Sequence, residues 1–372
     1  MRRIPQDVLV EIFMSCLPSE HNALIDSAEA PLLLGRICRH WRCVAYSTPM
    51  LWSSIHIPSF DYNVVPPDIL FKLERMVEAW LERSGTCSLS VSLFDPTVHS
   101  TVAAHPLISQ LLPVSQRLRQ LALSRFGDAG FFRPLLQLGS EALPLLKSVR
   151  IETTANLLIQ EHPEAMNMFQ IPTVEDVSLR ISESVDPLSL PLKWSQLTGL
   201  NLACYRLWTQ NGPLGGLDLG GALNVLRMCP NLRRCELRMT KAPEDVAETV
   251  DPTPIILPHI HTLIFKGRFN FDGWISHLVV PDLRYLQVGE EISGDAASLP
   301  TQDGDGCMRA HIDPDYFTTG SSGALTIFPH DLPSPTIHAD PPIPRRCVPC
   351  ALLSTARLVP IVDPYNYHDP RG

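Results

Sequence analysis

The sequence predicts an α/β protein in which a small module of three helices precedes a domain of repeated short parallel strands and a Pro-rich tail. Apolar residues recur at helical spacing through the first 58 residues. A frame of three apolar residues then recurs seven times before residue 290. Beyond that point, 12 of the 35 Pro fall within the last 82 residues. We therefore expect a helical module at 1–58, a bridging helix at 59–86, the strand repeat at 87–290 and a poorly ordered tail at 291–372.

Composition and charge exclude several classes of protein. The 372 residues are 45% apolar and 19% charged, which excludes disorder along the whole chain. The formal net charge of −9 argues against nucleic acid or an anionic membrane surface as the partner. No apolar run approaches the roughly 20 residues of a membrane-spanning helix, and no signal-peptide core follows the first residues. We expect a cytoplasmic or nuclear protein.

The cysteines and the known catalytic motifs give no sign of a metal site or an active site. The ten Cys are dispersed along the chain, so we expect reduced thiols rather than a disulfide framework. Cys347 and Cys350 would supply half of a zinc site, but Cys307, His311 and His338 stand at no recognised spacing from them. The sequence also lacks a phosphate-binding loop, a dinucleotide fingerprint, a nucleophile elbow and a zinc-protease motif. These observations predict a protein that is not an enzyme and binds no cofactor.

The first helix is predicted over residues 4–17. Pro5 fits its first turn, Asp7 lies at the positive end of the helix dipole, and Pro18 ends it. Its apolar side is predicted to contain Val8, Ile12 and Cys16, broadened by Leu9 and Phe13. Its more exposed side is predicted to contain Gln6, Val10 and Met14.

Residues 31–46 repeat the helical spacing after a polar stretch at 19–30. Their periodic apolar residues are Leu33, Ile37, Trp41 and Val44, which predict two short helices or one bent helix. Residues 49–52 close the module, and residues 53–57 alternate polar and apolar residues as a strand does.

This N-terminal segment resembles an F-box in its fungal form, down to the ending Ser47-Thr-Pro-Met-Leu-Trp-Ser-Ser54. Members of that family dock on the adaptor subunit of an SCF-type cullin ubiquitin ligase. The resemblance implies that the adaptor-binding residues are Ile4, Pro5, Val8, Leu9, Ile12, Phe13, Leu34, Ile37, Cys38 and Trp41. The chain departs from the family pattern at Gln6-Asp7 and in the longer loop at 19–30. Alternatively, the apolar residues only form the core of a three-helix module.

A bridging helix is predicted between Pro66 and Gly85. Its apolar stripe comprises Ile69, Leu73, Val77 and Trp80, flanked by Leu70, Met76 and Leu81. Such a stripe favours packing on the larger domain, although it could also serve an external partner. Residues 80–85 and the alternating residues 89–93 also resemble the segment that follows the F-box in the fungal family.

The repeat is defined by a frame in which an apolar residue is followed at the third and fifth positions by two more. The seven frames begin at Leu118, Leu146, Val174, Leu197, Leu232, Ile260 and Leu283. Successive first positions differ by 28, 28, 23, 35, 28 and 23 residues. Most of these intervals are typical of leucine-rich repeats. Each frame predicts one parallel strand of a solenoid, with short helices at 130–136 and 222–228 covering its back. An ordinary α/β sheet is the alternative.

The alternation of strand side chains predicts which residues face outward from the repeat. Among them, Arg150, Arg180, Arg234, Arg238, Lys266 and Tyr285 are the candidate target-binding residues. Arginines gathered on one face would suit an acidic or phosphorylated segment of a target protein. The alternative is a solvated face of mixed charge.

Together these features favour a substrate receptor that holds the ligase adaptor with its first module and a protein target with its repeat. A non-catalytic repeat scaffold that binds a partner without recruiting the ligase is the alternative.

Overall fold

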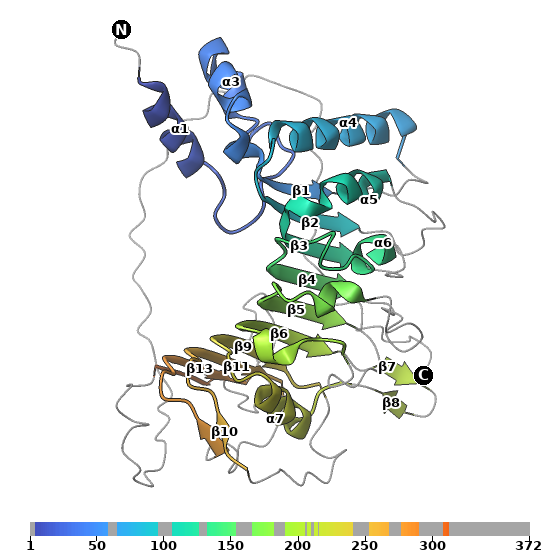
Figure 1. The fold of residues 1–372 in the computed structure, drawn as a ribbon, viewed down its shortest axis with the longest axis vertical. Helices are drawn as coiled ribbons and strands as arrows, with labels where there is room; N and C mark the ends of the chain where they lie inside the picture. The colour runs from blue at the N-terminus through green and yellow to red at the C-terminus, as the bar shows by residue number, and fades with distance from the viewer. Residues whose placement is uncertain are drawn as a thin grey trace, which may run out of the picture. The chain divides into compact units, whose positions relative to one another are not determined.

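A ten-stranded sheet organises the chain, and its first nine strands are parallel (Figure 1). These nine are β1 (Ser54–Pro58), β2 (Leu89–Asp95), β3 (Leu118–Arg125), β4 (Ser148–Thr153), β5 (Asp176–Ile181), β6 (Gly199–Cys204), β9 (Arg234–Arg238), β11 (Thr262–Lys266) and β13 (Tyr285–Val288). They lie side by side in chain order. The predicted α/β class and the parallel pairing of the repeated strands are therefore confirmed.

The computed structural model describes twelve stretches of the chain, all within the compact unit Met1–Ile327. They are residues 4–58, 65–95, 106–125, 132–153, 166–181, 190–204, 207–209, 212–214, 216–240, 253–267, 277–289 and 308–311. The predicted tail at 291–372, including Cys347 and Cys350, lies outside them apart from residues 308–311.

The apolar frame sets the register of the sheet. Leu121 pairs with Val149, and the same frame position continues through Val177, Leu200, Cys235, Leu263 and Leu286. The third frame position forms a parallel row from Leu123 to Val288. All 21 frame residues of the seven repeats are buried. Because side chains alternate across a strand, one face of every strand supplies the core.

The repeated frame begins earlier in the chain than Leu118, the first residue of the seven predicted frames. Trp52, Ile55 and Ile57 have the same spacing, and all three are buried. Ile55 of β1 pairs with Val91 of β2, which pairs with Leu121. The strand predicted at 53–57 is thus the first strand of the large sheet, and the buried residues of the N-terminal helices and of the sheet form one core cluster.

Four short helical segments precede β1. They are α1 (Gln6–Ser15), α2 (Leu34–Ile37), α3 (Arg39–Tyr46) and the 3-10 helix η1 (Pro49–Trp52). Polar contacts tie them together: the Trp52 indole Nε1 donates to the Ala45 carbonyl at 2.9 Å, and Thr48 Oγ1 donates to the Val44 carbonyl at 2.7 Å. Of the two possibilities predicted for residues 31–46, the structure has the two short helices, α2 and α3, with Cys38 between them.

The bridging helix α4 (Pro67–Arg83) connects β1 to β2 and packs mainly on the core. Its Leu73, Val77 and Trp80 are buried. The Trp80 ring lies edge-on to Trp52, with centroids 4.8 Å apart, and the Arg83 guanidinium lies 4.8 Å from the Trp52 ring centroid. These contacts favour the core interpretation of the stripe, although Ile69 and Met76 remain exposed.

Shorter elements fill the connections between the later strands. The helices are α5 (Pro106–Leu111), η2 (Leu112–Arg117), α6 (Arg133–Leu136), η5 (Asn167–Gln170), η7 (Trp194–Gln196) and α7 (Leu219–Met228). Two small sheets join β7 (Leu207–Thr209) to β8 (Gly212–Leu214) and β10 (Ile255–Ile256) to β12 (Leu278–Val279). Figure 1 shows α4, α5, α6 and α7 beside the strands that they connect.

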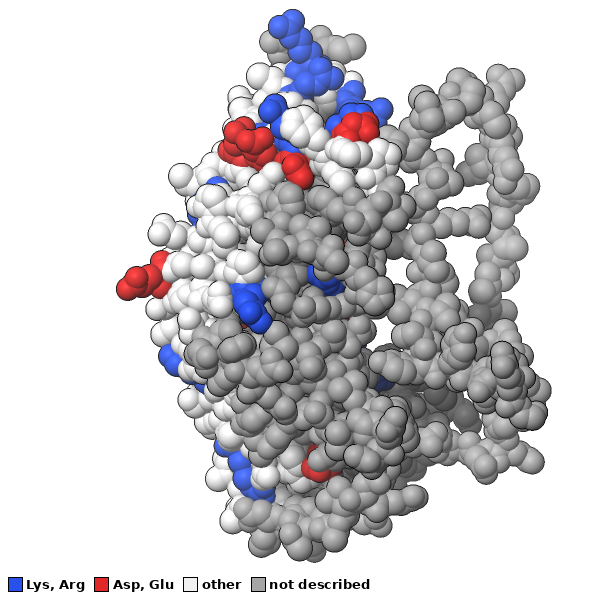
Figure 2. Space-filling view, turned by 90° about the vertical axis from the view of Figure 1, so that its right-hand side faces the viewer, with Lys and Arg blue, Asp and Glu red and all other residues white. Residues whose placement is uncertain are grey.

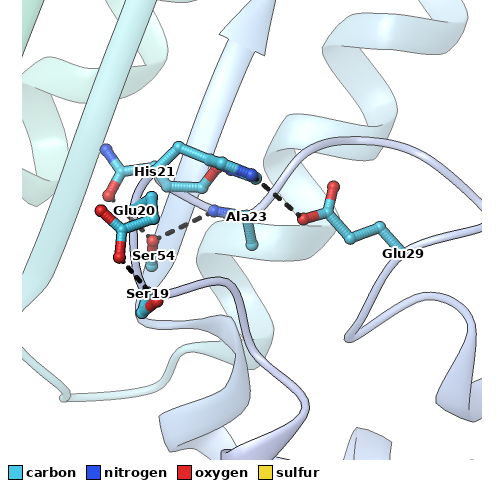
Figure 3. Close-up of polar contacts among 7 residues, drawn as sticks. Ser19, Glu20, His21, Ala23, Glu29 and Ser54 are labelled. Atoms are coloured by element: carbon cyan, nitrogen blue, oxygen red, sulfur yellow. Dashed lines mark hydrogen bonds and ion pairs between the residues drawn. The ribbon is translucent and has the colours of Figure 1, made fainter. Parts of the chain in front are cut away.

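The first and the last parallel strands of the large sheet, β1 and β13, each bond to a further segment of the chain. The last parallel strand, β13, pairs with the antiparallel strand β14 (Met308–His311), a strand that the sequence did not predict. At the other end, the backbone N–H of His56 donates to the Ala23 carbonyl at 2.8 Å. The loop at 19–30 is held there by further polar contacts, including a bond from Ala23 N–H to Ser54 Oγ at 3.2 Å (Figure 3). Unpaired strand edges invite association with other chains, so these segments protect the sheet.

Candidate functional site

Helix α1 carries two apolar faces. Leu9 and Phe13 are buried, and Val10 and Met14 are partly buried against the same core. The prediction that Val10 and Met14 lie on the more exposed side was therefore wrong. The apolar set was divided incorrectly because the sequence does not show on which side of α1 the rest of the protein lies.

The second apolar face of α1 is exposed. Ile4 is 50% exposed, Val8 46% and Ile12 41%. Val8 and Ile12 lie one turn apart on one side of α1, and Ile4 precedes the helix by two residues. We call Ile4, Val8 and Ile12 the α1 stripe. Pro5 and Cys16 are also exposed. None of the residues that the structure describes buries the α1 stripe.

The remaining residues predicted to bind the adaptor divide between surface and core. Ile37 and Cys38 are exposed, whereas Leu34 is buried. Trp41 is half-buried, and its ring packs on Phe13 with centroids 4.9 Å apart. Leu9, Phe13 and Leu34 are thus core residues that shape the surface, and a partner would meet the other predicted side chains.

The helices beside α1 present basic side chains. Cys38 begins α3, and its Sγ accepts a hydrogen bond from the Trp41 N–H at 3.4 Å. Arg36, Arg39 and Arg42 of α2 and α3 are exposed, and Figure 2 shows Lys and Arg side chains gathered at this end of the molecule, at the top of the view. The Arg42 Nε also donates to the Gly35 carbonyl at 2.6 Å, which ties α3 to α2.

The outward face of the sheet holds the residues predicted to bind a target. Arg150 and Arg180 on β4 and β5, and Arg234 on β9, are exposed, as the strand alternation predicts. Arg238 and Lys266 are partly exposed on the same face. The sheet order places β4 beside β5 and β9 beside β11, with β6 between the two pairs of strands.

Carboxylates intervene between these basic groups. Arg180 Nη1 lies 2.9 Å from Glu152 Oε1, and Arg234 Nη2 lies 2.8 Å from Asp176 Oδ2. Lys266 Nζ lies 2.8 Å from Glu236 Oε1. Carboxylates therefore neutralise much of the positive charge expected on this face, and the face is of mixed charge.

Tyr285 closes the same face at its last parallel strand. Its hydroxyl donates to Gln287 Oε1 at 2.8 Å, and the Tyr285 side chain is half-buried. Gln287, which the alternation placed outward, is only 3% exposed. Tyr285 thus presents a partly covered ring rather than a free hydroxyl.

Sequence reasoning missed a second row of charged residues, directly after the first apolar position of each frame. The row comprises Arg119, Lys147, Glu175, Thr198, Arg233, His261 and Arg284. Arg119, Lys147, Arg233 and Arg284 are exposed. The signal was available, because a Lys or Arg occupies this position in four of the seven frames.

Two buried thiols, Cys229 after α7 and Cys235 on β9, are unsuited to nucleophilic chemistry. Burial raises the pKa of the Cys229 thiol to about 12. Burial also raises the pKa of Cys235, well above its usual range. Both therefore stay protonated at neutral pH and act as small apolar side chains.

Neither a metal cluster nor a membrane-spanning helix is found in the described part of the chain. Among those residues, no three His, Cys, Asp or Glu side chains lie close enough together to hold a metal ion. No helix described there is both long and apolar enough to cross a bilayer. No protein-family model matches the chain, and no curated protein matches its sequence.

Proposed function

We propose that this chain is the substrate-recognition subunit of an SCF-type cullin ubiquitin ligase. The α1 stripe, with Ile37 and Cys38, binds the adaptor subunit, and the outward side of the sheet binds a protein target. The observation that carries the proposal is the exposed apolar α1 stripe on a helix whose opposite face is already buried.

A helix that packs on one core needs only one apolar face. Leu9 and Phe13 are the residues by which α1 packs on the core, so the α1 stripe is not needed for that packing. Burying a large aliphatic side chain stabilises a complex by roughly 1.5–3 kcal/mol. The three side chains of the stripe are already about half covered, so a partner that buried them would gain roughly half of that free energy from each one. The F-box resemblance supplies that partner as the adaptor subunit.

The sheet supports the second half of the proposal. Its strands follow one another in chain order at intervals typical of leucine-rich repeats, and in such a solenoid the outward side chains form a continuous surface for a partner. The outward positions of β4, β5 and β9 carry exposed or partly exposed polar and charged residues. A mixed-charge surface suits a protein target, since opposed charges fix its register more than its affinity.

The decisive experiment is capture of purified adaptor by the full chain and by a Val8→Asp, Ile12→Asp variant. Both side chains are exposed, so the fold should survive, as circular dichroism would verify. We expect adaptor capture to be lost, because a carboxylate would be buried against an apolar groove. Ile69→Asp on α4 is the matched control, because Ile69 is as exposed as Ile12 but lies outside the stripe.

Two outcomes would contradict ligase recruitment. Full capture by the folded double variant would show that the stripe is not the docking surface. No capture by the unaltered chain would leave the alternative, a repeat scaffold that binds its partner without the ligase.

A further inference from the structure

The row of residues missed by sequence reasoning is continuous in space. Each member after Arg119 donates its backbone N–H to the carbonyl of the member that precedes it in the row. The six bonds run from Lys147 to Arg119, Glu175 to Lys147, Thr198 to Glu175, Arg233 to Thr198, His261 to Arg233 and Arg284 to His261, at 2.7–3.0 Å. The row therefore follows the N-terminal edge of the strands from β3 to β13.

Positive charge concentrates at the β9–β13 end of this row. Arg233, His261 and Arg284 precede three neighbouring strands, and we call these three residues the Arg-His-Arg edge. Arg233 and Arg284 are exposed, and neither makes an ion pair with any described residue. Asp282 is exposed near Arg284 in the sequence but forms no ion pair with it.

Lys147 and Glu175 of the row balance each other, whereas Arg119, at the β3 end of the row, is exposed and forms no ion pair with a described residue. Lys147 Nζ lies 2.9 Å from Glu175 Oε1, so its charge is satisfied within the row. Arg234, next to the Arg-His-Arg edge, pairs with Asp176. Within the described part of the chain, Arg233 and Arg284 are thus two positive charges without an ion pair, in a protein whose formal net charge is −9.

The spacing of the edge fits a peptide. Neighbouring strands lie about 4.8 Å apart, so Arg233 and Arg284 are separated by about 10 Å. Two carboxylates two or three residues apart in an extended segment are about 7–10 Å apart. Each guanidinium can bind a carboxylate with two parallel hydrogen bonds. The positive surface is too small to follow a nucleic-acid backbone, which needs a longer basic stripe.

We infer that the Arg-His-Arg edge binds an acidic segment of the target protein, with Arg233 and Arg284 each holding one carboxylate. The inference deepens the target-binding half of the proposed function, on which it rests. Recognition of the target then extends from the mixed-charge face of the sheet to its N-terminal edge, where neither Arg233 nor Arg284 forms an ion pair with a described carboxylate.

The test measures binding of a fluorescent peptide with three Glu at alternate positions to the full chain, by anisotropy at low and high salt. We expect binding that weakens with salt and falls at least tenfold in an Arg233→Ser, Arg284→Ser variant. Arg119→Ser is the matched control, because Arg119 is an exposed arginine at the opposite end of the same row. It should bind the peptide as the unaltered chain does.

Several results would overturn the inference. They are equal binding of a peptide with Gln in place of Glu, unchanged binding by the double variant, no binding to the unaltered chain, or tighter binding of a single-stranded oligonucleotide that displaces the peptide. Adaptor capture by the double variant separates the two hypotheses. It should be unchanged, because the α1 stripe is intact.

Discussion

Arg234 on β9 forms an ion pair with Asp176 on β5 although β6 runs between the two strands. The Arg234 Nη2 atom lies 2.8 Å from Asp176 Oδ2. The β6 residue aligned with both is Gly199. A Cβ atom added at Gly199 would lie 2.7 Å from Asp176 Oδ2, which is too close for contact without movement. Because Gly199 has no side chain, the side chains of Arg234 and Asp176 can meet over β6.

Gly199→Ala should therefore be energetically coupled to Asp176. Alanine in a strand is favoured over glycine by roughly 0.5–1 kcal/mol, but here it must displace the carboxylate. We expect Gly199→Ala to give no gain in the unaltered chain and a gain of about 0.5–1 kcal/mol in an Asp176→Ala background. Urea unfolding of the four proteins measures this coupling. If the effects of the two substitutions on the free energy of unfolding add to within about 0.3 kcal/mol, the ion pair across β6 does not depend on Gly199.

A second ion pair lies inside the protein. Arg125 Nη1 is 3.4 Å from Asp95 Oδ2, and each side chain is 2% exposed. The two residues are register partners at the ends of β2 and β3. Removing one residue of a buried ion pair leaves the other buried charge without that ion-pair partner, which is strongly destabilising.

Asp95→Ala should destabilise the chain by about 3–5 kcal/mol. The double variant Asp95→Leu, Arg125→Met should recover most of that loss, because it buries no charge. Thermal and urea unfolding of both variants check the expectation. If Asp95→Ala costs less than about 1 kcal/mol, water or another group must satisfy Arg125 when its partner is removed.

The parallel sheet was predictable because its signal is periodic. Each frame places three buried side chains at fixed spacing, and a one-residue shift would expose them, so the register follows from the residues alone. Cys235 replaces an aliphatic residue without breaking the pattern, since a buried thiol behaves as a small apolar group.

The remaining features depend on which segments become neighbours in space, and the sequence has no signal for that. Trp52 has the frame spacing, but it was assigned to the helical module because the chain reaches β2 only after α4. The alternation placed Arg180 and Arg234 outward, yet their ion pairs with Glu152 and Asp176 depend on which strands become neighbours. The pairing of β14 with β13 joins segments about 20 residues apart with no periodic signal.

The last prediction concerns pH and the imidazole of His56 on β1. Its Nδ1 shares a hydrogen bond of 2.9 Å with Ser92 Oγ. Burial, with a smaller contribution from nearby His21, lowers the pKa of His56 below its ordinary value of 6.5.

Above pH 6.5 the His56 imidazole is neutral in both states, so it gives the stability no pH dependence. As the pH falls through 6.5, the unfolded chain takes up a proton that the folded chain does not, and stability is lost until the pH reaches the lower pKa of the folded state. His56→Gln retains a side chain that can bond Ser92 but cannot titrate. We expect the unaltered chain to lose more unfolding free energy than His56→Gln between pH 7.5 and pH 5.5, as measured by urea unfolding. Equal losses in the two proteins would show that His56 is protonated as readily in the folded state as in the unfolded one, because its site would then be open to water.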